Sequence, residues 1–122
     1  MAEAKPDTIA VVDDDRAVRD SLRFLLETVG HKVETFVGAT DFLRAEFRRV
    51  ACLLLDHHMP GMTGLEPAEH LNAAGVTIPI LLITGAPSPA IVARAAKLGI
   101  TRVLEKPPDE DDILTFIDAA ML

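Results

Sequence analysis

The sequence predicts an α/β fold: a single domain in which five βα units build a doubly wound, five-stranded parallel sheet. Three observations support this prediction. A chain of 122 residues has the length of one domain with one core. Short apolar runs alternate with stretches of helical periodicity, and the connections between them are short. The run that ends at Asp56 is apolar at every position from Leu53, as in a strand covered by helices on both faces.

The first βα unit is clear from its pattern. Thr8–Val12 is apolar and rich in residues that favour strands, and it runs into three aspartates. Apolar residues then recur at helical spacing from Arg16 onward, with Asp14 or Asp15 as the N-cap and Gly30 as the stop. We therefore expect residues 1–7 to form a flexible N-terminal tail and residues 8–122 to form the domain.

The other strands and helices follow in alternation. An alternating pattern over His31–Val37 indicates an edge strand. Further strands are predicted up to Asp56 and over Ile78–Ile83 and Ile100–Leu104. Helices are predicted over about 40–48, 64–74, 89–98 and 109–121.

Composition excludes several classes of function. A formal net charge of −7 argues against direct binding of nucleic acid by this domain, because phosphate binding requires clustered Lys and Arg. The apolar runs are too short for a membrane span, and the N-terminus lacks the apolar segment of a secretory signal. The single cysteine, Cys52, lies in an apolar run and has no disulfide partner in the chain. We expect a cytoplasmic protein with no membrane contact.

Polar residues of distinct chemistry follow four of the five predicted strands. They are Asp13 and Asp14, Asp56, Thr84 and Lys106. The carboxyl ends of parallel strands meet at one edge, so the carboxylates are expected to repel one another by several kcal/mol at about 4–6 Å. Oxygen ligands of this kind select a hard cation, and Mg²⁺ is the best candidate. Each motif alone is typical of a turn or a helix cap, but the complete set predicts a pocket that accepts a phosphoryl group.

The motifs VVDDD, LLLDHHMPGMTGLE, ITG and EKP resemble the receiver domain of bacterial two-component response regulators, and most of all its FixJ-like branch. The resemblance extends from Ile9 to the last helix. It implies a flavodoxin-like, CheY-like sheet with strand order 2-1-3-4-5. It also implies that Asp56 is the phosphoacceptor, that Asp14 ligates Mg²⁺ directly, that Asp13 does so mostly through water, and that the His58 backbone carbonyl is a further ligand.

The resemblance assigns two more residues to the phosphoryl group. Thr84 is expected to donate a hydrogen bond to it, and Lys106 to pair with it, with a cis peptide bond between Lys106 and Pro107. The expected donor is a phosphohistidine of a sensor histidine kinase or a small acyl phosphate. No enzymatic activity is expected beyond phosphotransfer to the domain itself and hydrolysis of its own acyl phosphate.

The family's switching surface would lie on the fourth helix, fifth strand and fifth helix. Its partners would be an output domain or another protein, with transcription regulation as the usual outcome, and phosphorylation could drive homodimerisation. The sequence departs from the family at Val103, where an aromatic residue is usual. His57 and His58 raise the alternative of a transition-metal site, and the arginines at 16, 19 and 23 are expected to form a solvated helix face.

Two other functions remain open on the sequence. A small Mg²⁺-dependent phosphatase of the haloacid-dehalogenase type would use Asp13 as the nucleophile, but it would leave Asp56 without a role. An interaction module that is not regulated by phosphate would keep the fold. The missing aromatic residue allows that alternative, but every residue of the acidic pocket is present. The three functions differ in which aspartate takes up a phosphoryl group: Asp56 in a receiver domain, Asp13 in a phosphatase, and neither in an interaction module.

Overall fold

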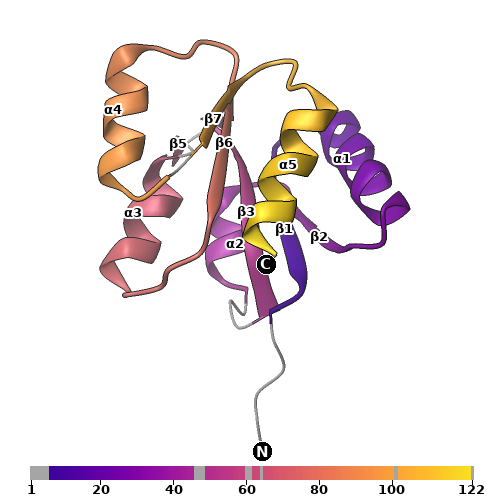
Figure 1. Cartoon of the computed structure of the whole chain (residues 1–122). Helices are drawn as coiled ribbons and strands as arrows, with labels where there is room; N and C mark the ends of the chain where they lie inside the picture. The colour runs from indigo at the N-terminus through magenta and orange to yellow at the C-terminus, as the bar shows by residue number, and fades with distance from the viewer. Residues whose placement is uncertain (1–5, 46–48, 60–61, 64, 101, 122) are drawn as a thin grey trace, which may run out of the picture.

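The computed structural model describes residues 6–45, 49–59, 62–63, 65–100 and 102–121. These residues form one parallel sheet with helices on both faces (Figure 1). The strands of this sheet are β1 (Thr8–Val12), β2 (Lys32–Phe36), β3 (Val50–Asp56), β6 (Ile80–Thr84) and β7 (Arg102–Glu105). The helices are α1 (Arg16–Thr28), α2 (Ala39–Leu43), α3 (Leu65–Ala73), α4 (Pro89–Lys97) and α5 (Glu110–Ala120).

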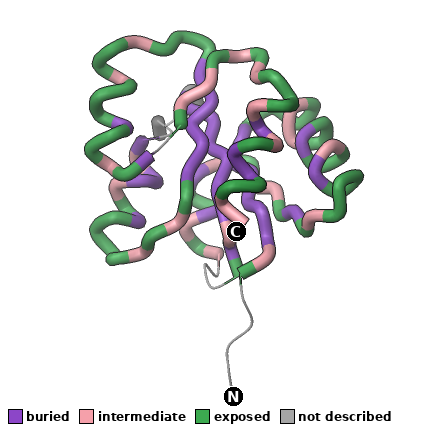
Figure 2. The backbone as a smooth tube through the Cα atoms, in the orientation of Figure 1, coloured by how far each residue is buried: buried purple, intermediate pink, exposed green. Residues whose placement is uncertain are grey.

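The strand order is β2-β1-β3-β6-β7, and all neighbouring pairs are parallel. Counted in chain order within this sheet, that is 2-1-3-4-5, so the predicted fold class and strand order are confirmed. The central strands β1 and β6 are buried at every position because helices cover both faces. The outer strands β2 and β7 are only partly buried (Figure 2), in agreement with the alternating pattern predicted for the edge.

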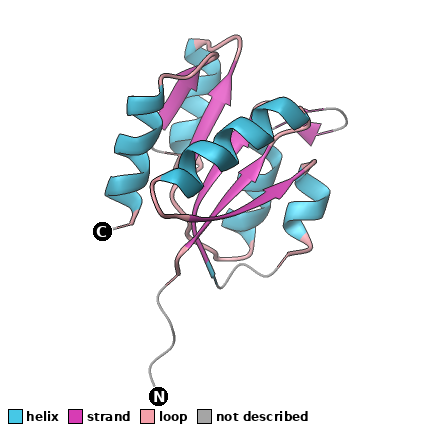
Figure 3. Ribbon diagram, turned by 90° about the vertical axis from the view of Figure 1, so that its right-hand side faces the viewer, coloured by secondary structure: helices cyan, strands magenta, loops and turns pink. Residues whose placement is uncertain are grey.

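The core has two parts, one on each face of the sheet (Figure 3). On one face, α1 and α5 pack through Leu22, Leu26, Ile113 and Ile117. On the other face, α2, α3 and α4 pack through residues such as Phe42, Leu71 and Ala95. Because successive residues of a strand point to opposite faces, each apolar strand contributes to both parts.

Helix starts follow the expected capping chemistry. Asp15 caps α1 by accepting hydrogen bonds from the N–H groups of Ala17 and Val18, at 2.8 and 3.3 Å. Ser88 caps α4 in the same way, and Asp109 caps α5. Gly30 has a φ of 95°, which is the left-handed conformation that ends a helix, so the stop predicted after the first helix is confirmed.

Two of the boundaries that differ from the predictions have a physical reason in the structure. Helix α2 ends at Leu43, although a helix was expected over about 40–48, and residues 46–48 lie outside the described part of the chain. Its buried positions are Ala39 and Phe42, and a short helix depends on such packing more than on propensity. Strand β6 begins at Ile80 instead of Ile78, because Pro79 has no N–H to donate to a sheet.

A two-stranded antiparallel hairpin was not predicted. Its strands are β4 (His58–Met59) and β5 (Met62–Thr63), which follow β3 directly. At the other end of the chain, the expected tail falls mostly on residues 1–5, which are not described. Asp7 donates its N–H to the Arg49 carbonyl at 3.1 Å and its carboxylate pairs with Lys32 at 2.9 Å. None of the helices described is both long and apolar enough to cross a lipid bilayer.

The packing of α1 generates a prediction about stability. Leu26 is fully buried, whereas Phe24 on the same helix is 75% exposed. We expect Leu26→Ala to lower the free energy of unfolding by about 2–5 kcal/mol, because it removes buried methyl groups and leaves a cavity. Phe24→Ala, the matched control, should change it by less than about 0.5 kcal/mol. Urea denaturation measures both, and equal losses would contradict the position of α1.

Candidate functional site

Three carboxylates meet at the carboxyl end of the sheet. Asp13 and Asp14 follow β1, and Asp56 is the last residue of the adjacent strand β3, where Val12 lies opposite Leu55. One oxygen atom of each of the three carboxylates lies within 4.8 Å of the others. Asp13 and Asp56 are buried, with 4% and 3% of their surface exposed, whereas Asp14 is exposed. The strand register therefore brings together the acidic residues that the sequence places on separate elements.

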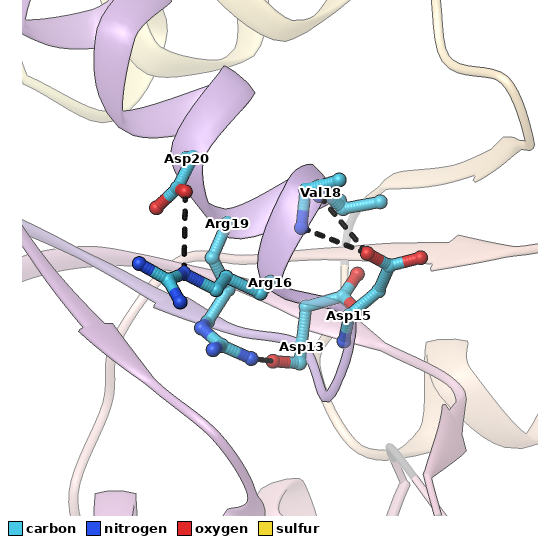
Figure 4. A network of polar contacts seen from close by, with 7 residues as sticks. Asp13, Asp15, Arg16, Val18, Arg19 and Asp20 are labelled. Carbon is cyan, nitrogen blue, oxygen red and sulfur yellow. Dashed lines mark hydrogen bonds and ion pairs between the residues drawn. The ribbon is translucent and has the colours of Figure 1, made fainter.

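The backbone and side chain of Asp13 are held by several hydrogen bonds. Its N–H donates to the Phe36 carbonyl at 3.1 Å, and its carboxylate accepts from the Asp15 N–H at 2.8 Å. Its own carbonyl accepts a hydrogen bond from the Arg19 guanidinium, as Figure 4 shows. The turn between β1 and α1 is thus fixed at both ends, by the edge strand β2 and by the first helix.

Lys106 supplies the positive charge of the site. Its Nζ lies 2.7 Å from Oδ1 of Asp56, and its backbone N–H donates to the Thr84 carbonyl at 2.9 Å. The Lys106 side chain is 35% exposed and that of Asp56 only 2%, so the pair joins a buried carboxylate to a cation at the rim. The peptide bond between Lys106 and Pro107 is cis, as the resemblance implied.

Thr84 ends β6, beside the acidic residues. Asp56 pairs in register with Ile83, which places Thr84 one residue further along the neighbouring strand. Thr84 is fully buried, and its hydroxyl oxygen accepts a hydrogen bond from the Ala86 N–H at 3.2 Å. The end of β6 and the turn that follows it therefore fix this hydroxyl group on the strand next to the one that ends at Asp56.

Burial and charge act in opposite directions on the titrating groups. Burial raises the pKa of Asp13; the hydrogen bond from the Asp15 N–H opposes this, and the negative charge of Asp56 adds to it. Burial alone would lower the pKa of Lys106, but its hydrogen bond to Asp56 and the attraction of all three carboxylates outweigh that effect and raise the pKa. Lys106 therefore remains charged and compensates one of three clustered carboxylates at neutral pH.

The donor set fits a hard divalent cation. Three carboxylates with one lysine leave an excess of negative charge, and carboxylate oxygens are the ligands that Mg²⁺ prefers. In the described part of the chain, these aspartates are the one group of three or more His, Cys, Asp or Glu side chains close enough to hold an ion.

His57 is buried, and its backbone N–H donates to the Ile83 carbonyl at 2.9 Å, which extends the pairing of β3 with β6.

Three residues that the sequence analysis singled out remain to be placed. His58 begins β4 two residues after Asp56, and its assigned role uses only its backbone carbonyl. Val103 is partly buried against the α2, α3 and α4 face, at the position where the family usually has an aromatic residue. Burial raises the pKa of Cys52 to about 12, so the thiol stays protonated at neutral pH and contributes as a small apolar group.

One contact was missed by the sequence interpretation. Arg19 was expected on a solvated helix face, but it is only partly exposed, and its Nη1 donates to the Asp13 carbonyl at 2.9 Å. A periodic pattern cannot predict this contact, because the guanidinium reaches back past the start of its own helix to a backbone atom. The only sequence feature that suggests it is a long side chain with hydrogen-bond donors, placed shortly after an acidic loop on the helix that follows that loop.

A mostly apolar cavity of about 480 Å³ lies next to Lys106. It lies between α1 and the start of α5, with Ile83 among its lining residues. From α1 it is lined by Ala17, Val18, Ser21, Leu22 and Leu25, from the segment before α5 by Pro107 and Pro108, and from α5 by Glu110 and Ile113.

Comparisons with known proteins agree with this architecture. The transcriptional regulatory protein FixJ of Azorhizobium caulinodans is 38% identical over 122 residues, which cover 99% of this chain and 57% of the relative. The chain thus spans a little over half the length of that curated relative. A solved structure of the response regulator StyR is 43% identical, with a TM-score of 0.88 over 97% of this chain and 60% of that one. The crystal structure of FixJ-N is 32% identical, with a TM-score of 0.83 over 99% of this chain and 95% of that one.

The family match covers nearly all of the sheet and reaches both helical layers. Residues 9–118 match the family model described as the response regulator receiver domain. This span includes the three aspartates, Thr84 and Lys106. The chain therefore belongs to the receiver domain family of two-component response regulators, in its FixJ-like branch.

Proposed function

We propose that this receiver domain accepts a phosphoryl group on Asp56 from the phosphohistidine of a sensor histidine kinase, in a Mg²⁺-dependent reaction. The observation that carries the proposal is the buried Asp56 carboxylate, which lies 2.7 Å from Lys106 and within a cluster of two further aspartates. Such a pocket disfavours further negative charge unless a cation balances it. It is therefore suited to receive a phosphoryl group only together with a metal ion.

Each residue of the site has its own role in the proposed phosphotransfer. Asp13, Asp14, Asp56 and the His58 carbonyl would hold Mg²⁺, which supplies positive charge next to the phosphoryl oxygens. A carboxylate oxygen of Asp56 forms the new bond to phosphorus, and the bond to the donor's imidazole nitrogen breaks. Lys106 then pairs with a phosphoryl oxygen in place of the carboxylate, and Thr84 donates its hydroxyl hydrogen to another. Catalysis is by positioning and charge compensation, and water later hydrolyses the acyl phosphate.

The response would be transmitted to the surface formed by α4, β7 and α5. Helix α4 is suited to move because Ala95 is its one buried residue and only Ile91 and Leu98 pack partly against the core. An ion pair between Arg94 and Glu69 joins it to α3, and a second between Arg102 and Asp112 joins β7 to α5 at 3.6 Å. Movement of Thr84 toward a phosphoryl group would shift the turn before α4 and bias these contacts.

The proposed partners follow from the family and from the chain's share of its relatives. A receiver domain implies a histidine kinase, and the cavity beside Lys106 offers an apolar surface close to the phosphoacceptor for that partner. The matched curated relatives are transcription regulators about twice as long as this chain, which supports control of an output domain or partner protein. We further propose that the domain is cytoplasmic and that phosphorylation promotes homodimerisation. Nucleic acid would be bound by the output domain and not by this acidic domain.

Intact mass spectrometry after incubation with a small acyl phosphate tests the phosphoacceptor. We expect a phosphoryl adduct that requires Mg²⁺ and maps to Asp56. Asp56→Asn should abolish it, because an amide cannot form the acyl phosphate, whereas Asp118→Asn on the exposed side of α5 should leave it unchanged. An adduct on Asp13 would favour a phosphatase instead. No adduct even with a histidine kinase would favour a phosphate-independent interaction module.

The raised pKa of Asp13 predicts how stability depends on pH without metal. The protonated carboxyl is favoured in the folded state, so its contribution to stability is complete below the ordinary value of 3.8 and is lost as pH rises through the raised folded pKa. Asp13→Asn should therefore raise the free energy of unfolding at neutral pH, since the amide oxygen can still accept from the Asp15 N–H. The difference from wild type should disappear toward pH 3.8. Urea denaturation in EDTA measures this difference, and a less stable variant at neutral pH would contradict the raised pKa of Asp13.

A further inference from the structure

Three arginines lie on α1, and their guanidinium groups have different surroundings. Arg16 is 86% exposed and pairs with Asp20 at 3.7 Å. Arg23 pairs with Glu27 at 3.8 Å and lies 3.5 Å from the Val33 carbonyl. Arg19 instead turns back toward the acidic loop, where its Nη1 donates to the Asp13 carbonyl at 2.9 Å (Figure 4). One arginine of the three thus contacts the backbone that carries the acidic pair.

We infer that Arg19 is a positioning residue for the metal site, which holds the Asp13–Asp14 peptide in the orientation that binding requires. The inference rests on the proposed function, because it concerns how the same acidic pair holds Mg²⁺. Arg19 is not among the residues that would hold the ion or contact the phosphoryl group. It acts through a backbone carbonyl. It lies on α1, whereas the acidic residues follow β1 or end β3.

The planarity of the peptide bond explains why one hydrogen bond has this effect. The Asp13 carbonyl belongs to the same rigid unit as the Asp14 N–H, so fixing the carbonyl also fixes the start of Asp14. Asp13 is further held by its own N–H and by its carboxylate, through Phe36 and Asp15. Asp14 is the exposed member of the acidic cluster, and the Arg19 contact lies on the peptide that leads to it.

The charge of Arg19 and its hydrogen bond have opposite effects on metal binding. A guanidinium near the site repels a divalent cation, so electrostatics alone predicts that removal of Arg19 tightens Mg²⁺ binding. Loss of the hydrogen bond loosens the loop, so the positioning role predicts weaker binding. Groups that orient metal ligands typically contribute about 10-fold to 100-fold in affinity, which exceeds the effect of a partly screened charge.

The test is Mg²⁺ binding to the unphosphorylated full chain, measured by isothermal titration calorimetry at neutral pH and fixed ionic strength. Arg19→Met keeps most of the aliphatic stem and the helix propensity but removes the donor. We expect its dissociation constant to rise by about 10-fold. Arg16→Met, the matched control, removes the same charge from the same helix without a contact to the loop, and its affinity should equal that of wild type or be slightly tighter.

Unfolding in EDTA separates positioning from a general loss of structure. A purely structural role would lower the free energy of unfolding of Arg19→Met and leave the dissociation constant of folded molecules unchanged, which would overturn the inference. Unchanged or tighter binding by Arg19→Met would overturn it too, as would equal weakening in both variants. If Arg19→Met folds only in part, amide NMR titration gives the dissociation constant of the folded fraction.

Failure of the inference and failure of the proposed function give different results. If wild type binds Mg²⁺ and is phosphorylated on Asp56, but Arg19→Met binds as tightly, only the role of Arg19 is wrong. If wild type binds no Mg²⁺ and no adduct forms, the proposed function is wrong, and the inference falls with it. Weaker binding in Arg19→Met alone, with Arg16→Met unchanged, supports both.

Discussion

The mutual repulsion of Asp13, Asp14 and Asp56 is the constraint on which the rest of the site depends. Three carboxylates whose oxygen atoms lie within 4.8 Å of one another would separate if the backbone allowed it. The fold prevents this, because two of them are buried at the ends of adjacent parallel strands. The cation Lys106, the cap residue Asp15 and the donor Arg19 all compensate or restrain this cluster.

The rigidity of the sheet makes such an unfavourable cluster tolerable. Strands β1, β3 and β6 are packed on both faces, so their ends cannot move apart without disrupting two parts of the core. Around this fixed frame, the elements differ in how firmly they are attached. Helix α1 buries two leucines and is capped by Asp15 of the acidic loop, whereas α4 buries only an alanine. Under the proposed function, this unequal attachment would let a change at the cluster move α4 more easily than α1.

Much of this architecture could be predicted from the sequence, because strong patterns and local chemistry agree. Fully apolar strands, helical periodicity and glycine stops predict the βα order, and polar residues at strand ends predict which side chains gather. The hairpin β4–β5 could not be predicted, since strands of two residues have no periodicity. The early end of α2 depends on tertiary packing, and the contact of Arg19 with a carbonyl depends on a side-chain path that spacing does not encode.

The partly buried outer strands have a consequence for solubility at high concentration. An exposed edge offers unpaired backbone groups to a second chain, and charged side chains on short strands oppose such growth. Strand β2 carries Lys32 and Glu34, and the four-residue strand β7 begins with Arg102 and ends with Glu105. Joining two sheets edge to edge would bring these charges together and remove water from them. The charged residues on both outer strands therefore oppose extension of the sheet from one molecule into the next.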